Sequence, residues 1–275
     1  MIDIHTHPCW LRDHETYNHF DERGEIPEAA LEPYFEAISD VDKAVALAFW
    51  APDSRIEVSN AFVAEVVRHD PARLVGFASV DPKLPDAISE LDKAIGDLGL
   101  QGLKLGPIYQ HFVPDDTAYW PLYARVQELD IPIMWHQGTS FMVPEGPLEA
   151  SQPHRLDIIA RTFPNIKMVI AHFGYPWPRE VVALLRRHPH VYTDISVLAN
   201  RPWFLYNALI DALEYGAEDK ILLGSDYPAF TARETVEALW KINDFARGTS
   251  LPTVPPKVLE AIIERDSLAL LGIAS

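Results

Sequence analysis

The chain has 275 residues, of which 48% are hydrophobic, so there is enough apolar material for a large core. Acidic residues outnumber basic ones 40 to 23, which gives a formal net charge of -17. This balance argues against nucleic acid as a partner, because nucleic acid is bound through Lys and Arg side chains that neutralise phosphates. It argues equally against an anionic membrane surface.

The compartment can be predicted from the cysteine count and from the first residues. Cys9 is the one cysteine, which excludes an intrachain disulfide and fits a reducing compartment. The chain opens on a strand-like run, Met1 to Ile4, so no signal peptide is expected. No apolar run approaches the ~20 residues of a membrane span. We therefore expect a cytoplasmic protein without a membrane anchor.

Short apolar runs rich in β-branched residues alternate with longer amphipathic runs along the chain. The runs typical of strands cover about residues 2–5, 43–49, 74–80, 102–105, 131–136, 167–172, 191–194 and 220–226. The runs typical of helices cover about residues 27–39, 55–69, 84–98, 118–129, 153–162, 178–187 and 202–214, and then 232–245, 256–265 and 267–271. Strands that are apolar nearly throughout indicate a parallel sheet buried on both faces. The pattern predicts one α/β domain over residues 1–275, a single (β/α)8 TIM barrel with extra C-terminal helices.

Five side chains that can bind a metal fall at the ends of these strands. His5 and His7 end the first strand, and residues two apart in an extended chain point the same way. His136 ends the fifth strand, His172 the sixth and Asp226 the eighth. Barrel active sites are built at this carboxyl-terminal face. Imidazole and carboxylate groups suit Zn²⁺, Mn²⁺ or Fe²⁺, so the pattern predicts a divalent metal site.

Each of these residues also has a structural explanation when it is considered alone. A single histidine at a strand end is often a hydrogen-bonded structural residue, and Asp226 precedes Tyr227 and Pro228, which is typical of a cap or a turn. Their joint occurrence on one rim of a barrel favours the metal site.

The same segments resemble a known family. His5-Thr6-His7, preceded by Ile-Asp-Ile, is similar to the opening of the amidohydrolase superfamily. The segments 166–174 and 222–228 resemble its amidohydrolase-related (amidohydrolase 2) branch. That branch includes aminocarboxymuconate semialdehyde decarboxylase, hydroxybenzoate decarboxylases such as γ-resorcylate decarboxylase, and several lactone hydrolases. The resemblance runs in order from Met1 to about Pro228.

This resemblance implies roles for individual residues. One divalent metal ion, with Zn²⁺ expected first and Mn²⁺ or Fe²⁺ as alternatives, would be bound by His5, His7, His136 and Asp226. His172 would lie beside the metal and, together with Asp226, would pass protons during catalysis. Asp194, which ends the seventh strand, would orient a histidine. The resemblance also makes a homodimer one of the expected states, sometimes formed through the C-terminal helices.

Candidate substrate contacts lie near strand ends or in the strand-to-helix loops, namely Lys104, Arg201, Trp10, Tyr109, His111 and Tyr175. Lys104 could pair with a substrate carboxylate as a point charge, and Arg201 could hold one through two hydrogen bonds. The alternative for both is a solvent-facing side chain. A further alternative for Lys104 is the carboxylated lysine that bridges two metals in binuclear amidohydrolases, but in the mononuclear branch this position does not bridge metals.

Three functions remain open at this point, all with a small molecule as the partner. The first is a metal-dependent hydrolase, in which water activated by the cation attacks a C–O or C–N bond of a lactone, ester or amide. The second is a metal-dependent non-oxidative decarboxylase, or carboxy-lyase, and the third is a barrel that binds without catalysis. A short first loop and a modest segment over residues 138–153 favour the hydrolase, because the best-known decarboxylases of the branch have longer loops.

Overall fold

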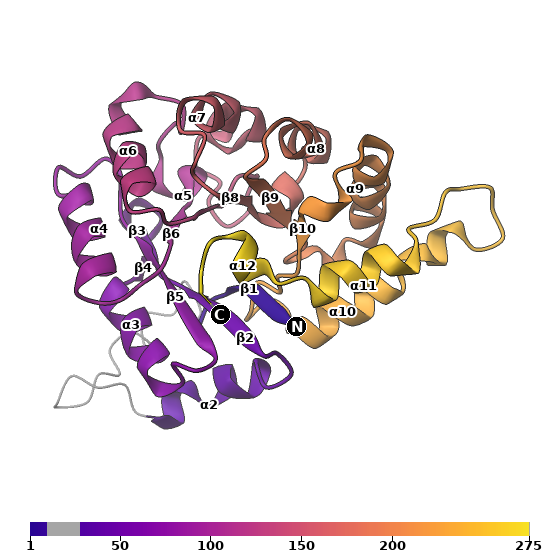
Figure 1. The fold of residues 1–275 in the computed structure, drawn as a ribbon, viewed down its shortest axis with the longest axis horizontal. Helices are drawn as coiled ribbons and strands as arrows, with labels where there is room; N and C mark the ends of the chain where they lie inside the picture. Colours follow the sequence, from indigo (N-terminus) through magenta and orange to yellow (C-terminus); the bar gives the residue numbers. More distant parts are fainter. Residues whose placement is uncertain (10–27, 275) are drawn as a thin grey trace.

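The barrel is closed by hydrogen bonds between its first and last strands. The computed structural model describes residues 1–9 and 28–274, and its main sheet has eight parallel strands in the spatial order of the sequence. The segment after the last strand returns to the first, where the backbone N–H of Ile4 donates to Leu223 O at 3.1 Å. The N–H of Asp226 donates to His5 O at 2.8 Å, and Thr6 bridges to Tyr227. The predicted eight-stranded barrel is therefore confirmed (Figure 1).

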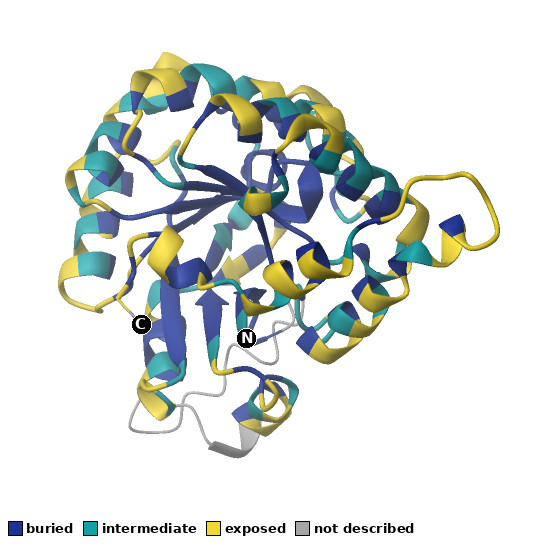
Figure 2. Cartoon of the chain, turned by 45° about the vertical axis from the view of Figure 1, so that its right-hand side comes forward, coloured by how far each residue is buried: buried dark blue, intermediate teal, exposed yellow. Residues whose placement is uncertain are grey.

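The strands are short, and most are buried along their whole length. In spatial order they are β1 (Ile2–Thr6), β2 (Lys43–Leu47), β5 (Leu74–Ser79), β6 (Leu103–Leu105), β7 (Ile133–Trp135), β8 (Met168–Ile170), β9 (Val191–Asp194) and β10 (Ile221–Leu222). Burial on both faces explains why they read as apolar runs rather than as an alternation of apolar and polar residues. Figure 2 shows them as a dark-blue centre inside a ring of helices whose outer faces are exposed.

The helices that surround the barrel pack their apolar faces on the strands. They are α2 (Glu28–Ala37), α3 (Asn60–His69), α4 (Ala87–Gly96), α6 (Trp120–Glu128), α7 (Leu156–Thr162), α8 (Pro178–Arg187) and α9 (Pro202–Tyr215), followed by α10 (Ala232–Trp240), α11 (Pro256–Glu264) and α12 (Ser267–Leu270). The helix α9 ends where Gly216 adopts a φ of 66°, a left-handed conformation that terminates helices.

Alternate strand residues fill the barrel, and the C-terminal helix α12 closes one end of it. One apolar cluster contains Ile4, Val45, Leu47, Val75, Phe77, Met134, Val169, Tyr192 and Leu222 together with Leu268, Leu271 and Ile273. Their neighbours Ala44 and Ala46 belong to the outer cluster between sheet and helices. A Cβ on Gly272 would lie 2.9 Å from Nζ of Lys167, which precedes β8, so α12 closes the end opposite the strand carboxyl termini.

The predicted helix over residues 55–69 is wrong at its start. The strands β3 (Phe49–Ala51) and β4 (Ile56–Val58) form an antiparallel hairpin in this part of the chain. The helix α3 begins only at Asn60, and the side chain of Ser59 caps it by accepting a hydrogen bond from the N–H of Phe62. Ile56 and Val58 are buried and Glu57 between them is exposed, which is the period of a strand.

Two of the predicted strands also end earlier than expected. The strand β8 ends at Ile170, and His172 and Phe173 have φ angles of 57° and 51°. The strand β10 ends at Leu222, and Asp226 has a φ of 63°. Non-glycine residues pay about 1–3 kcal/mol for such conformations, which cluster at functional sites.

Across residues 1–9 and 28–274, no helix combines the length and the apolar character that a membrane crossing requires.

Candidate active site

Two histidines of the first strand and the aspartate that follows the last strand meet at one point. His5 lies on β1 and His7 is the residue that follows this strand; both are buried and point the same way. The Nε2 atom of His5 lies 3.3 Å from Oδ1 of Asp226, and Nε2 of His7 lies 3.4 Å from the same oxygen. The left-handed turn at Asp226, held by its N–H bond to His5 O, directs the carboxylate into the barrel mouth.

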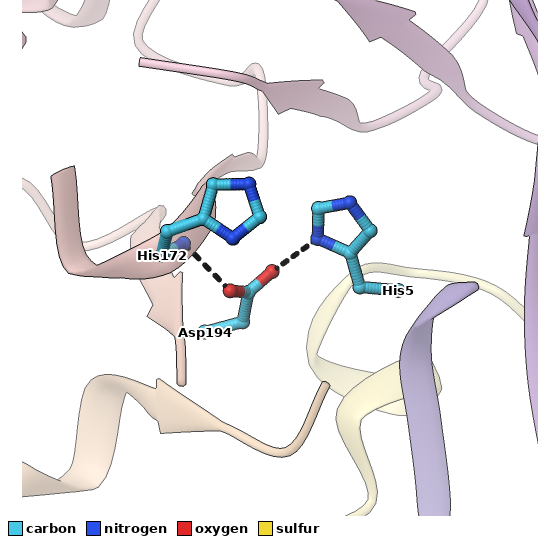
Figure 3. A group of neighbouring side chains, drawn as sticks. All are labelled: His5, His172 and Asp194. Carbon is cyan, nitrogen blue, oxygen red and sulfur yellow. Dashed lines mark hydrogen bonds and ion pairs between the residues drawn. The ribbon is translucent and has the colours of Figure 1, made fainter. Parts of the chain in front are cut away.

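The other side of the His5 ring is held by Asp194, at the end of β9. Nδ1 of His5 lies 2.9 Å from Oδ2 of Asp194, and both side chains are buried (Figure 3). A carboxylate only accepts hydrogen bonds, so Nδ1 of His5 carries the proton and Nε2 has a free lone pair. The structure thus gives Asp194 the contact with a histidine that the sequence predicts.

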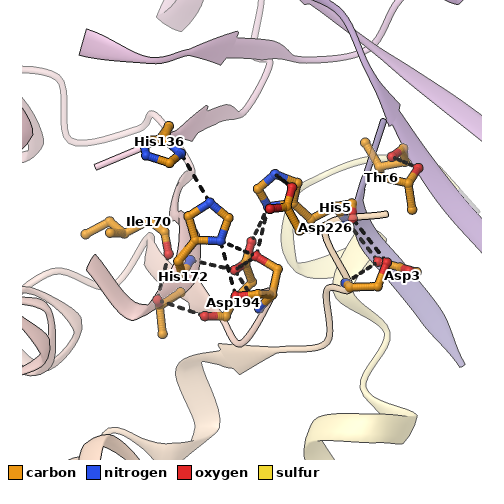
Figure 4. A network of polar contacts seen from close by, with 12 residues as sticks. Asp3, His5, Thr6, His136, Ile170, His172, Asp194 and Asp226 are labelled. Atoms are coloured by element: carbon orange, nitrogen blue, oxygen red, sulfur yellow. Dashed lines mark hydrogen bonds and ion pairs between the residues drawn. The ribbon is translucent and has the colours of Figure 1, made fainter. Parts of the chain in front are cut away.

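His172 and His136 extend this group along the barrel rim. The N–H of His172 donates to Oδ1 of Asp194 at 2.8 Å, and the His172 ring stacks on His5 with centroids 5.0 Å apart. Nε2 of His172 lies 3.1 Å from Nδ1 of His136, which follows β7 (Figure 4). Ser196, two residues beyond Asp194, contacts both His172 and His5 through its hydroxyl.

The predicted four-residue metal set is thus brought to one rim, but its members are not equidistant. Ligand atoms of His5, His7 and Asp226 lie within 4.8 Å of one another, as do those of His5, His172 and Asp194. His136 belongs to neither of these compact groups and touches them through His172. That His136 supplies the fourth ligand stays a prediction.

Burial keeps His5, His7 and His136 neutral. Burial, together with the positive charge of Lys104, lowers the pKa of His5 to about 3, although Asp194 and Asp226 act to raise it. Burial likewise lowers the pKa of His7 and, more strongly, that of His136. Neutral imidazoles have the lone pairs that a metal ligand needs.

The two carboxyl groups, in contrast, stay ionised. Burial alone would raise the pKa of Asp226, but the imidazoles of His5, His7 and His172 hold it well below its usual range. Burial would also raise the pKa of Asp194, and His5 together with the other polar neighbours holds it below its usual range.

This donor set fits a divalent cation. Nε2 of His5 faces an ionised carboxylate oxygen of Asp226 at 3.3 Å and the ammonium of Lys104 at 3.2 Å. Imidazole nitrogens and a carboxylate oxygen gathered this closely are a donor set that suits a divalent cation. Nδ1 of His7 and Nε2 of His136 are, in addition, buried atoms without a hydrogen-bond partner among the residues that the structure describes. His5, His7 and Asp226 are the residues that would hold the ion.

Lys104 on β6 is buried beside this cluster, so its alternative interpretation as a solvent-facing lysine is wrong. Its Nζ lies 3.2 Å from Nε2 of His5 and 5.8 Å from the ring centroid of Phe49. Burial lowers the pKa of Lys104 to about 8, although Asp226 and Asp194 act to raise it. At neutral pH the ammonium supplies a positive charge at the floor of the site.

Below the cluster, one layer deeper in the barrel, lies the carboxyl group of Asp3. Its Oδ1 accepts the N–H of His5 at 3.1 Å and the N–H of Ser225 at 3.0 Å, which ties β1 to the segment after β10. Burial raises the pKa of Asp3 to about 7, although these hydrogen bonds act to lower it.

A cavity of about 390 Å³ opens over the histidines. This volume is near the lower end for ligand sites, ~300–1,000 Å³. Four of the predicted substrate contacts line it, namely Lys104, Tyr109, Tyr175 and Arg201. His111 does not line it, because the left-handed turn that ends α5 (Pro107–Gln110) directs the chain away. Trp10 lies outside the described residues.

The loop after β7 contributes contacts that the sequence did not single out. Ser140, Phe141 and Met142 line the cavity, and the hydroxyl of Tyr109 donates to Oγ of Ser140 at 2.7 Å. Phe141 is 84% exposed, so an apolar ring stands in water at the mouth of the cavity. Its position in a strand-to-helix loop on the active face is the one signal that could have found it.

Arg201 also lines the cavity. Its guanidinium lies 4.9 Å from the ring centroid of Tyr175, and Nη1 donates to Val197 O and to Oδ1 of Asn200. Within residues 1–9 and 28–274, neither Arg201 nor Lys104 forms an ion pair with a carboxylate. Two cations therefore line the cavity together with the histidines and remain available to an anionic ligand.

A closed (β/α)8 barrel with a His-x-His pair, further histidines and an aspartate at its carboxyl-terminal face defines an enzyme of the amidohydrolase type. A family model described as amidohydrolase matches residues 2–273. The chain belongs to the amidohydrolase family.

Curated relatives include two decarboxylases and a hydratase. The chain is 28% identical over 215 residues to γ-resorcylate decarboxylase of Polaromonas sp., covering 62% of this chain and 64% of that protein. It is 24% identical over 239 residues to 2-amino-3-carboxymuconate-6-semialdehyde decarboxylase of Dictyostelium discoideum, covering 74% and 66%. Over 149 residues it is 28% identical to 2-keto-4-carboxy-3-hexenedioate hydratase of Sphingobium sp., covering 45% and 42%. The chain thus spans slightly less than two thirds of the length of the two decarboxylases.

Solved structures share the fold over nearly the whole chain. An uncharacterised TIM-barrel protein from Bordetella bronchiseptica superposes with a TM-score of 0.72 at 22% identity, covering 99% of this chain and 98% of that one. A dihydroxybenzoic acid decarboxylase from Polaromonas sp., solved with bound manganese and the inhibitor 2-nitroresorcinol, gives a TM-score of 0.66 at 19% identity, covering 98% and 96%. At these identities the likeness supports the fold.

Proposed function

We propose that this chain is a metal-dependent non-oxidative decarboxylase of a small carboxylic acid. The observation that carries the proposal is that two cations, Lys104 and Arg201, line the same small cavity as the histidines. A carboxylate substrate would be the anionic partner that these two side chains do not have among the residues that the structure describes. The two decarboxylases among the relatives support the same reaction, more than they support the hydrolase that loop lengths favoured.

The reaction replaces a carboxyl group by hydrogen. The bond between the substrate carbon and its carboxyl carbon breaks, CO₂ leaves, and the electron pair stays on the substrate carbon, which takes up a proton. A divalent cation bound by His5, His7 and Asp226 would polarise the substrate oxygens. Zn²⁺, Mn²⁺ and Fe²⁺ all suit this nitrogen and oxygen donor set.

The proton carriers follow from the charge states of the side chains. Asp226 is ionised at rest because its pKa is held well below the usual range, so it accepts a proton before it can donate one. Once protonated, a carboxyl group of low pKa readily gives its proton to carbon. His172 lies across His5 from Asp226, and its ring can exchange a proton with a substrate hydroxyl.

The test compares reaction products over two sets of compounds. Purified metal-loaded protein would be incubated in D₂O with hydroxybenzoates, including 2,6-dihydroxybenzoate, and with lactones, including 2-pyrone-4,6-dicarboxylate. We expect CO₂ release together with deuterium at the carbon that carried the carboxyl group, and loss of both in Asp226→Asn. Acid release from a lactone without CO₂ would instead establish hydrolysis, and addition of water to a double bond would establish hydration.

A further inference from the structure

Ser196 makes five polar contacts in the centre of the histidine cluster, one of them from its backbone N–H to Oδ1 of Asp194. It is fully buried two residues after Asp194, on the same side of the chain, while Ile195 between them packs in the apolar core. Its hydroxyl donates to Oδ1 of Asp194 and lies 2.7 Å from Nδ1 of His172 and 3.1 Å from Nδ1 of His5. Its backbone carbonyl lies 3.2 Å from the same Nδ1 of His172.

Counting protons in this network leaves one arrangement. The carboxylate of Asp194 accepts from every neighbour: the backbone N–H groups of His172 and Ser196 and the single hydroxyl proton of Ser196 all donate to its Oδ1. With that proton committed, the Ser196 oxygen can only accept from His172. The Ser196 carbonyl can also only accept. Two acceptors thus face Nδ1 of His172, so the proton of the neutral ring is on Nδ1 and the lone pair is on Nε2.

We propose that Ser196 is a positioning residue that sets the tautomer of His172. Through its hydroxyl and its carbonyl it holds the ring proton on the buried side and leaves the lone pair on Nε2, the atom that lies 3.1 Å from Nδ1 of His136. His172 also lines the cavity, so Nε2 is the nitrogen at which the ring can accept a proton from a substrate. Asp194 fixes His5 in the same tautomer directly, whereas His172 depends on Ser196, because Asp194 reaches only its backbone N–H. The orientation of two histidines on one rim therefore depends on the carboxylate of Asp194 and on the Ser196 hydroxyl that donates to it.

This assignment does not depend on which reaction the enzyme catalyses. It can be measured on metal-free protein without substrate, so its failure and the failure of the decarboxylase proposal are distinguishable. The experiment uses protein labelled with ¹⁵N-histidine at pH 8.5, where imidazoles of ordinary pKa are neutral. Long-range ¹H–¹⁵N correlation spectra distinguish a protonated Nδ1 from a protonated Nε2, and the spectrum of His172→Gln identifies the His172 signals by their loss.

In the parent protein we expect His172 with a proton on Nδ1 and a bare Nε2. In Ser196→Ala the ratio of the two tautomers should move toward protonated Nε2 by roughly five- to tenfold, which corresponds to the loss of about one buried hydrogen bond. Ser196→Thr keeps the hydroxyl and should restore the parent pattern. Ser151→Ala is the matched control, because Ser151 is also fully buried and donates to a backbone carbonyl, that of Leu148, in a different part of the chain.

The kinetic readout separates positioning from mere packing. Ser196→Ala should lower kcat by about 10²-fold, the lower end for loss of a positioned proton acceptor, with KM changed less than threefold. Ser151→Ala should leave both parameters unchanged. A parent spectrum with the His172 proton on Nε2 would overturn the proposal, and this measurement needs no variant to fold. An unchanged His172 spectrum in Ser196→Ala would overturn it as well.

Discussion

The buried carboxyl group of Asp3 makes the stability of the metal-free protein depend on pH. Its pKa rises from 3.8 in a model compound to about 7 in the fold, because burial disfavours the charged form. Between these two pH values the folded chain holds a proton that the unfolded chain has released. The folded state therefore binds more protons, and stability falls as pH rises through this window.

Replacing Asp3 by Asn removes this titration and keeps an oxygen that can accept the N–H groups of His5 and Ser225. At about 1.36 kcal/mol per pKa unit, the full difference amounts to about 4 kcal/mol. About 3 kcal/mol of it falls between pH 4.5 and 7.5. The free energy of unfolding of Asp3→Asn should thus gain about 3 kcal/mol relative to the parent over this range.

The assay is urea unfolding of chelator-treated protein at one-unit steps of pH, with Asp3→Asn and the parent measured side by side. Asp86→Asn controls for the loss of one negative charge, because Asp86 is exposed at the position just before α4, and its profile should run parallel to that of the parent. The reasoning fails if the difference between Asp3→Asn and the parent changes by less than about 1 kcal/mol across the range.

Three further predictions concern the cation and the cavity. Metal analysis should find about one equivalent of divalent metal in the parent and a small fraction of that in Asp226→Asn. The substitution removes the carboxylate that both His5 and His7 contact. A full second equivalent in the parent would contradict a single-ion site. Arg201→Gln should raise KM for a carboxylate substrate about tenfold or more, because a charge-assisted hydrogen bond contributes roughly 1.5–3 kcal/mol, and an unchanged KM would remove Arg201 from the substrate site. Phe141→Ala should raise KM and leave the midpoint of thermal unfolding unchanged, because its exposed ring packs on little in the free protein; a lower midpoint would instead indicate a packing role.

The alternation of strand-like and helix-like runs was sufficient to predict the barrel, because buried parallel strands read as apolar runs regardless of their exact ends. The two left-handed turns could not be predicted. His172 continues an apolar run, and its φ of 57° is supported by a hydrogen bond from its N–H to Asp194, which is 22 residues away in the chain. Contacts of this kind come from the closed barrel and have no local signal.

The active-site residues also divide into those that have a signal in the local sequence and those that do not. His5 and His7 could be assigned to one point because a strand has a fixed period of two. Whether Lys104 was inward or outward depended on which face of β6 lines the barrel, and Leu103 and Leu105 on either side of it are equally buried. Ser196 was not found, because an isolated serine after a strand is common, and only the positions of Asp194 and His172 give it a role.

The charges at the cavity floor predict the order in which cation and substrate bind. The two carboxylates of Asp194 and Asp226 and the ammonium of Lys104 together carry a net charge of about −1, which repels an anion. A divalent cation reverses this sign, so a carboxylate should bind the metal-loaded protein at least about tenfold more tightly than the chelated one. Titration calorimetry with 2,6-dihydroxybenzoate at pH 6.5, where Asp3 is mostly protonated, measures the ratio. Equal affinities would mean that Arg201 alone holds the substrate and that the cation acts only during the reaction.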